Sequence, residues 1–154
     1  MARSSEDQSR HKSDESTYDD PFRQSSVLPY QVGENGLEIM MVTSIRRRRW
    51  IIPKGVVEPD MTPQDSAAKE AFEEAGIKGI VIPEPLGRYH YKKWAGICRC
   101  DVFAMKVETV LDEWQEQDDR EREWVDAKEA VDRLRHKRLK TIVRRFIERH
   151  LDRS

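Results

Sequence analysis

The chain has little hydrophobic material and no long apolar run. Its 154 residues are 37% hydrophobic and 37% charged. No stretch approaches the roughly 18 consecutive apolar residues that a membrane-spanning helix needs. The front of the chain also lacks the apolar core of a signal peptide. We therefore expect a soluble, cytoplasmic protein that spans no membrane.

Cysteine is scarce, and neither sign of charge dominates. Cys98 and Cys100 lie two positions apart in a strand-like run, so they should point to the same face. We interpret them as small buried residues, because two thiols are too few ligands for a metal site and do not indicate an oxidising compartment. The 28 basic and 29 acidic residues give a net charge of −1. No overall field therefore favours nucleic acid as a partner, and the oligomeric state stays open.

Polar residues are concentrated at the front of the chain. Residues 1–25 contain almost no aliphatic side chains and many Ser, Asp, Glu, Arg and Lys. Such a segment buries too little apolar surface to offset the entropy of ordering it. We predict a disordered N-terminal tail over residues 1–25 and a single domain over residues 26–154, which is long enough for a sizeable core.

The remaining residues show strand-like and helix-like patterns. We expect strands at 27–32, 37–44, 80–82, 87–93, 97–107 and 123–125, and helices at 63–75, 126–134 and 138–151. The segment 112–122 is predicted to be a polar loop. These elements favour an α/β fold in which a mixed β-sheet lies between helices.

The first helix has clear boundary residues. Thr62 is expected to be the N-cap, with Pro63 at the first helical position and Asp65 three residues after the cap. Gly76 is expected to end the helix. Four apolar residues recur at helical spacing and predict its buried face: Ala68, Ala71, Phe72 and Ala75.

Three glutamates share one face of this helix. Glu70, Glu73 and Glu74 are spaced i, i+3 and i+4, so their side chains cluster beside the alanines. Like charges at this spacing destabilise an isolated helix, whereas a bound divalent cation reverses the effect, and Mg²⁺ prefers oxygen ligands of this kind. The triplet alone indicates no more than a solvated acidic face. The residues around it decide the interpretation.

Those surrounding residues resemble a known motif. From Gly55 to Ile77 the chain reads GVVEPDMTPQDSAAKEAFEEAGI. This run is similar to the Nudix box, which consists of Gly, five residues, Glu, seven residues, and then Arg-Glu-aliphatic-x-Glu-Glu-x-Gly-aliphatic. Positions 55, 70, 71, 73, 74, 76 and 77 match without a gap. The resemblance implies a strand, loop and helix that bind a metal ion, inside an α/β/α sandwich.

Two positions depart from the motif. Met61 stands where the box has its first Glu, and Lys69 replaces the Arg that usually braces the glutamates. Lys keeps the charge but lacks the rigid bidentate guanidinium, so we expect looser bracing of Glu73. Because all three glutamates of the helix remain, we still predict catalysis. A non-catalytic Nudix-fold sensor of a phosphorylated ligand is the alternative that Met61 and Lys69 leave open.

The resemblance extends to a subfamily. Segments 49–53, 110–114, 122–126 and 129–131 are similar to the diphosphoinositol polyphosphate phosphohydrolases, whose relatives cleave diadenosine polyphosphates. The resemblance implies that Glu73 is the general base, while Glu70, Glu74 and the backbone carbonyl of Gly55 bind Mg²⁺, or Mn²⁺ in its place. The implied reaction is hydrolysis of a phosphoanhydride bond in a diphosphoinositol polyphosphate or nucleoside polyphosphate. A dinucleoside polyphosphate or RNA 5′-end pyrophosphohydrolase is the alternative within this reaction class.

Basic residues outside the helix fit a small-molecule substrate rich in phosphate. The predicted substrate-binding residues are Arg46, Lys54, Lys92, Lys93, Lys137 and Arg138. Each could instead be an ordinary solvated charge. Tyr89, Tyr91 and Trp94 are candidate aromatic platforms for an adenine base, although Trp94 also fits a core or edge position.

Overall fold

The computed structural model describes residues 22–93 and 95–152. Residues 1–21 of the predicted tail, and Trp94, lie outside the described residues. The elements follow the chain in this order: β1 Arg23–Gly33, β2 Gly36–Thr43, β3 Trp50–Ile51, β4 Lys54–Val56, α1 Pro63–Ala75, β5 Ile77–Val81, β6 Gly87–Lys93, β7 Gly96–Val110, β8 Arg122–Asp126, α2 Ala127–Arg133 and α3 Lys137–Asp152.

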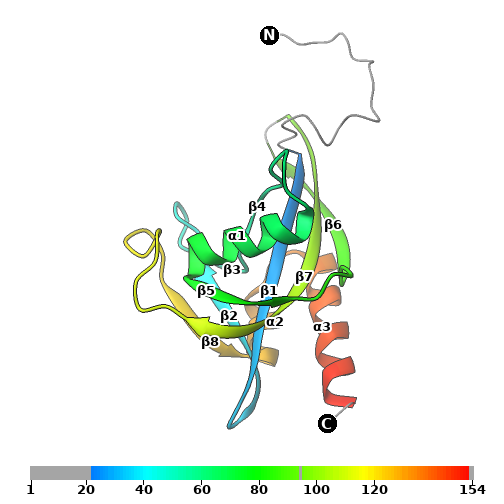
Figure 1. Cartoon of the computed structure of the whole chain (residues 1–154). Coiled ribbons are helices and arrows are strands. Elements are labelled where there is room, and N and C mark those ends of the chain that lie inside the picture. Colours follow the sequence, from blue (N-terminus) through cyan, green and yellow to red (C-terminus); the bar gives the residue numbers. More distant parts are fainter. Residues whose placement is uncertain (1–21, 94, 153–154) are drawn as a thin grey trace.

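The strands form one mixed sheet of eight strands within the described part of the chain. Its central order is β3-β2-β1-β7-β5, with β4 paired to β1, β6 to β7 and β8 to β2. β1 and β7 are parallel, and the other pairs are antiparallel. Figure 1 shows α1 across one face of this sheet, with α2 and α3 on the other. The predicted α/β/α arrangement is confirmed.

Two hydrophobic clusters separate the sheet from the helices. Because side chains alternate along a strand, neighbouring residues of β1 enter different clusters: Val27 packs toward α1, and Leu28 toward α2 and α3. Cys100 is fully buried in the second cluster, and both cysteines are free and buried, as predicted. No helix within residues 22–93 or 95–152 is long and apolar enough to cross a membrane.

β1 begins earlier than the sequence predicts. Its apolar pattern starts at Val27, yet the strand starts at Arg23. Gln24 is opposite Cys100 of β7, and Ser25 is opposite Gly55 of β4. Pairing on both sides supplies hydrogen-bond partners for the backbone of these polar residues. No apolar pattern in the sequence predicts this pairing.

The boundaries of α1 are confirmed, but its buried face is not made of the residues that the sequence predicts. Thr62 Oγ1 accepts a hydrogen bond from Asp65 N at 3.0 Å, and Gly76 ends the helix with φ 67°. Ala67 is fully buried, whereas Phe72 is 41% exposed, so the prediction that Phe72 is buried is wrong. The sheet faces the small side chains of α1: Ala67, Ala71 and Ala75.

Candidate active site

The predicted glutamates lie where α1 faces β4. A Cβ atom placed on Gly55 would lie 2.3 Å from the carboxyl carbon of Glu70, so only glycine permits this close approach. The backbone N–H of Lys54 donates a hydrogen bond to Glu74 Oε1 at 3.3 Å. The strand and the helix therefore bring Gly55, Glu70 and Glu74 together, at the spacing of the motif.

Glu74 is buried among other carboxylates. It is 5% exposed, and desolvation raises its pKa to about 9, an effect that Arg120 opposes and the charge of Glu70 reinforces. Desolvation also raises the pKa of Glu70, and the charge of Glu73 raises it further. Neighbouring carboxylates in a partly desolvated site disfavour ionisation of all of them, so this site holds more negative charge than its neighbours neutralise.

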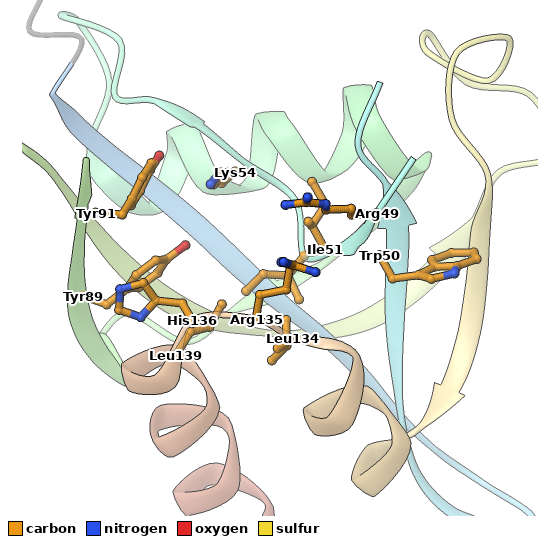
Figure 2. A pocket seen from close by; sticks show the side chains of 11 residues that line it. Arg49, Trp50, Ile51, Lys54, Tyr89, Tyr91, Leu134, Arg135, His136 and Leu139 are labelled. Carbon is orange, nitrogen blue, oxygen red and sulfur yellow. The ribbon is translucent and has the colours of Figure 1, made fainter. Parts of the chain in front are cut away.

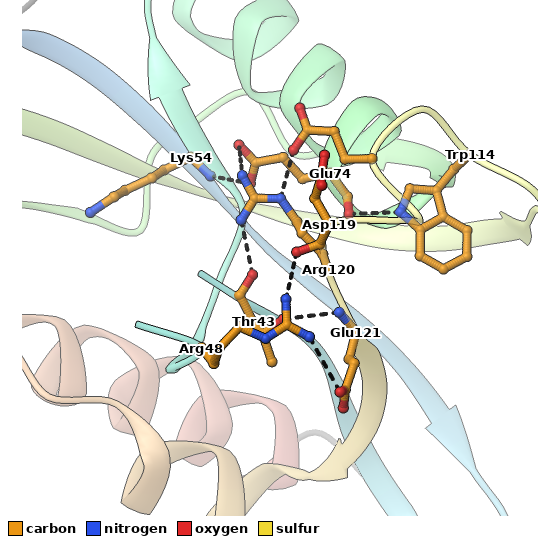
Figure 3. A network of polar contacts seen from close by, with 9 residues as sticks. Thr43, Arg48, Lys54, Glu74, Trp114, Asp119, Arg120 and Glu121 are labelled. Carbon is orange, nitrogen blue, oxygen red and sulfur yellow. Dashed lines mark hydrogen bonds and ion pairs between the residues drawn. The ribbon is translucent and has the colours of Figure 1, made fainter. Parts of the chain in front are cut away.

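Arg120 links α1 to the loop between β7 and β8 (Figure 3). Its side chain is 10% exposed and lies 3.6 Å from Glu74 Oε2 as an ion pair. Its Nε donates to Glu116 Oε1 at 2.6 Å, and its Nη1 donates to the carbonyl of Thr43 at 3.0 Å. The backbone N–H of Glu116 in turn donates to the carbonyl of Glu73 at 3.1 Å. The loop thus adds an arginine and a fourth carboxylate to the site.

The same loop and the first residue of β8 fix the C-terminal end of α1. Trp114 Nε1 donates to the backbone carbonyl of Glu74 at 3.0 Å, and Arg122 Nη1 donates to that of Ala75 at 2.8 Å. The guanidinium carbon of Arg122 lies 3.8 Å from the centre of the Trp114 ring system. Carbonyls in the last turn of a helix have no partner within the helix. Trp114 and Arg122 supply these partners and so hold the turn that carries Glu74.

A basic cleft adjoins Glu74. Its volume is about 390 Å³, and five of its lining residues are cationic: Arg46, Arg47, Lys54, Lys93 and Arg120. Within the described part of the chain, Arg46 and Arg47 form no ion pair with a carboxylate. We name this cavity the basic cleft.

A second cavity of about 460 Å³ shares Ile51 and Lys54 with the basic cleft. We name it the aromatic pocket; its walls consist of Arg49, Trp50, Ile51, Ile52, Lys54, Tyr89, Tyr91, Leu134, Arg135, His136 and Leu139. The rings of Tyr89 and Tyr91 stack with centroids 5.7 Å apart, and Tyr89 lies 4.8 Å from His136. Lys54 Nζ lies 4.2 Å from the Tyr91 ring centroid. Figure 2 shows Arg49 and Arg135 on the opposite side, where the charge of Arg135 lowers the pKa of Arg49.

Residues 23–149 match the family model described as the NUDIX domain. The chain belongs to the Nudix family. It is similar to Nudix hydrolase 13, mitochondrial, of Arabidopsis thaliana, with 34% identity over 87% of this chain and 78% of the relative. It is also 33% identical to diphosphoinositol polyphosphate phosphohydrolase 2 of Rattus norvegicus, over 75% of this chain and 65% of that protein.

A solved structure agrees on the fold. The C. elegans Ap4A hydrolase in a binary complex superposes with a TM-score of 0.69 and 17% identity, over 86% of this chain and 99% of that one. The predicted family is confirmed. The predicted enzyme class is confirmed as well: this chain is a Nudix hydrolase that cleaves a pyrophosphate bond. The Arabidopsis relative is mitochondrial by name, so a cytoplasmic location stays a prediction.

Nudix enzymes generally use a divalent metal ion, and the donor set of this chain fits one. No group of three or more His, Cys, Asp or Glu among the described residues is already arranged to hold a metal. The chemistry is nevertheless suitable, because Glu74 is buried, Glu70 is half-buried, and both are oxygen donors whose pKa values are raised. A divalent cation beside them would relieve the excess negative charge.

The predicted substrate-binding residues of this Nudix enzyme fall into two groups. Arg46, Lys54 and Lys93 line the basic cleft, whereas Lys92, Lys137 and Arg138 line neither cavity. Lys137 and Arg138 form the first turn of α3, and both are exposed. Arg138 is exposed and donates to the carbonyl of Arg88 at 3.3 Å.

Sequence reasoning missed several residues of the site. Arg135 directly precedes the basic run 136–138 that the sequence indicates for phosphate binding, and Arg135 and His136 line the aromatic pocket. Arg120 and Glu116 lay in a segment predicted only to be a polar loop. The signal that could have found them is their position between Trp114 and Arg122, both within segments that resemble the subfamily. Tyr89, proposed as an aromatic platform, lines the aromatic pocket but is only 4% exposed, so little of its ring is open to a ligand.

Proposed function

We propose that this Nudix enzyme hydrolyses a phosphoanhydride bond in a nucleoside polyphosphate, with Mg²⁺ or Mn²⁺ as its metal ion. The observation that carries the proposal is the position of Lys54, which lines both the basic cleft and the aromatic pocket. A ligand that occupies both cavities must be strongly anionic at one end and flat and apolar at the other. A nucleoside polyphosphate has this combination.

The basic cleft suits the phosphate chain. Arg46 and Arg47 lie beside Glu74 in its wall, with Lys54 and Lys93. Guanidinium groups bind phosphate oxygens through paired hydrogen bonds, and a lysine adds a compact positive charge. The phosphate chain would therefore lie along these cations, with the reacting phosphorus beside the glutamates.

The aromatic pocket suits a base more than an inositol ring. An inositol that carries phosphate on most of its carbons is anionic in every direction, whereas a base has two apolar faces. Most of the pocket wall is apolar or aromatic: Trp50, Ile51, Ile52, Tyr89, Tyr91, Leu134 and Leu139. Tyr91 and His136 are the rings best placed to contact a base, and Arg49 and Arg135 could bind a further phosphate.

The glutamates would divide the chemistry as follows. Glu70, Glu74 and the carbonyl of Gly55 would hold the metal ion, which when bound neutralises phosphate charge and lowers the pKa of water. Glu73 would accept the proton of the attacking water, and its contact with Lys69 Nζ at 2.5 Å would orient its carboxylate. The leaving phosphate departs with the electron pair of the broken P–O bond. Arg46 and Arg47 would bind the oxygens that gain negative charge.

A diphosphoinositol polyphosphate is the second candidate substrate. Arg49 and Arg135 face each other at the aromatic pocket without a carboxylate partner among the described residues, and such a pair could bind phosphates of an inositol ring. The rat relative named for this substrate is 33% identical. The two candidates differ in what the aromatic pocket contacts, so they can be separated.

The test is a phosphate-release screen with and without Mg²⁺ and Mn²⁺. It should compare nucleoside polyphosphates, dinucleoside polyphosphates, nucleotide sugars, inositol pyrophosphates and inorganic triphosphate. We expect Tyr91→Ala to raise KM for the nucleoside compounds and to leave inorganic triphosphate, which has no base, almost unaffected. An equal rise in KM for the nucleoside compounds and for inorganic triphosphate would mean that no base binds in the aromatic pocket. A preference for inositol pyrophosphates would select the second candidate, and binding without turnover would restore the sensor alternative.

A further inference from the structure

Lys69 contacts two carboxylates at once. Its Nζ lies 2.5 Å from Glu73 Oε2 on the next turn of α1 and 2.9 Å from Glu58 Oε2 in the loop before the helix. Hydrogen bonds to Glu73 and Glu58, in that order of importance, raise the pKa of Lys69. The ammonium group therefore bridges the loop and the carboxylate assigned to the general base.

The backbone of Glu58 is fixed against α1. Its N–H donates to Ser66 Oγ at 3.0 Å, and its carbonyl accepts from Met61 N at 3.0 Å. Ser66 is 1% exposed, so this anchor lies inside the protein. Because this backbone is already held, only the side-chain rotamers of Glu58 remain to be ordered when the contact forms. The loop thus places the side chain of Glu58 next to Lys69.

This arrangement bears on the unusual residue at position 61. Met61 stands where the motif has an acidic residue, and a methionine cannot pair with Lys69. Glu58, three residues earlier in the same loop, reaches Lys69 instead. The site therefore keeps a loop carboxylate opposite the cation on α1, although the motif position for it is lost.

We propose that Glu58 is a positioning residue that replaces the missing glutamate of the motif: it holds the ammonium group of Lys69, and Lys69 holds Glu73. This inference rests on the role of Glu73 in the proposed function. The side chains of Lys69 and Glu58 are 38% and 43% exposed, and exposed ion pairs stabilise a fold only slightly. The effect of Glu58 must therefore appear in the rate of hydrolysis far more than in stability.

Single and double variants of the full chain test the proposal, at saturating Mg²⁺ and across a substrate titration. We expect Glu58→Gln to lower kcat about three- to tenfold with little change in KM, because a displaced base reacts less often in the right geometry. Lys69→Met should lower kcat further, and Lys69→Arg should restore most of it. The matched control is Asp60→Asn, an exposed residue of the same loop that loses the same charge; its kcat should equal that of the wild type.

The double variant Glu58→Gln/Lys69→Met decides whether Glu58 acts through Lys69. Its kcat should equal that of Lys69→Met alone, since a residue that acts through another has no effect once that residue is gone. Independent, multiplying losses would overturn the proposal, as would a Glu58→Gln variant that behaves like Asp60→Asn. If the wild type releases phosphate from no compound in the screen, the proposed function fails instead.

Two readouts do not depend on turnover. Calorimetric Mn²⁺ affinity should be the same in Glu58→Gln and the wild type, because Glu58 contacts Lys69 and is not a metal ligand. A clear loss of Mn²⁺ affinity would make Glu58 a ligand and overturn the positioning role. A urea-unfolding cycle of Glu58→Gln and Lys69→Met should show a small favourable coupling between the two residues. A coupling of the opposite, unfavourable sign would contradict the ion pair and overturn the proposal.

Discussion

The indole N–H of Trp114 donates its hydrogen bond to the backbone carbonyl of Glu74, at 3.0 Å, across 40 positions of the sequence. Glu74 is the residue of α1 whose carboxylate also contacts the backbone N–H of Lys54 and the guanidinium of Arg120. Backbone and side chain of Glu74 are therefore held by three residues from two segments of the chain, β4 and the loop between β7 and β8. This constraint explains why a loop without regular structure matters to the site.

Trp114→Phe removes this hydrogen bond and keeps most of the ring. We expect the free energy of unfolding to fall by about 1 kcal/mol, the usual contribution of one such bond, and kcat at limiting Mg²⁺ to fall as well. Urea unfolding and a Mg²⁺ titration of activity measure the two effects. Trp124→Phe is the control, because Trp124 lies on β8 at the edge of the core cluster that faces α1 and its replacement removes the same indole. If both variants lost metal affinity alike, the contact to Glu74 would not be the cause.

The three glutamates should respond differently to replacement by glutamine. Glu73→Gln removes the proposed base, so kcat should fall on the order of 10²-fold or more while Mg²⁺ affinity changes little. Glu70→Gln and Glu74→Gln should weaken metal binding, so that higher Mg²⁺ recovers part of the activity. Steady-state kinetics across a Mg²⁺ titration distinguishes these outcomes. Full activity in Glu73→Gln would remove it from the base role.

The metal-free protein should lose stability as the pH rises. The folded-state pKa of Glu74, about 9, lies above its ordinary value of 4.5, so the folded state binds the proton more tightly than the unfolded chain does. The stabilising contribution of Glu74 is therefore fully present below about pH 4.5 and is lost as the pH rises toward 9.

Urea unfolding in EDTA from pH 4 to pH 9 checks this dependence. Other groups also titrate, so the useful quantity is the wild-type stability minus that of Glu74→Gln. This difference should decline as the pH rises, because glutamine stays neutral, and Mg²⁺ should restore wild-type stability at the alkaline end. A difference that is constant with pH would mean that Glu74 is not perturbed in the folded state.

Arg46→Ala should weaken substrate capture. Arg46 lines the basic cleft without an ion-pair partner among the described residues, so it is free to bind phosphate in both ground and transition states. KM for a polyphosphate substrate should therefore rise more than kcat falls, and added salt should reduce the difference from the wild type. Arg144→Ala, an equal loss of charge on the exposed face of α3, should leave KM unchanged. An unchanged KM in Arg46→Ala would mean that Arg46 is an ordinary solvated charge and does not bind the substrate.

The sequence by itself determined α1 and the grouping of its glutamates. Thr62, Pro63 and Gly76 act on backbone groups within a turn of their own positions, so their effect does not depend on the rest of the fold. The clustering of Glu70, Glu73 and Glu74 follows from helical geometry alone. The match to the Nudix box added the family, since its separated positions lie on this one strand, loop and helix.

Only the tertiary structure decided which face of α1 is buried and where β1 begins. Phe72 fits an apolar helical stripe, but the sheet approaches the small side chains of Ala67 and Ala71, so the large ring is left toward solvent. Arg23 and Gln24 carry no strand pattern and become a strand because β4 and β7 pair with this stretch. Both outcomes depend on contacts between segments distant in the sequence, which a local pattern does not contain.

The walls of the site were also decided by the tertiary structure. Arg120 reaches Glu74 because β8 returns beside β2 and brings the preceding loop to the end of α1. Arg135 lines the aromatic pocket and Arg138 does not: α3 begins between them, and Arg138 contacts the carbonyl of Arg88 on β6. A run of basic residues predicts phosphate binding in general. Which of its members faces the cavity depends on the path of the backbone through the folded protein.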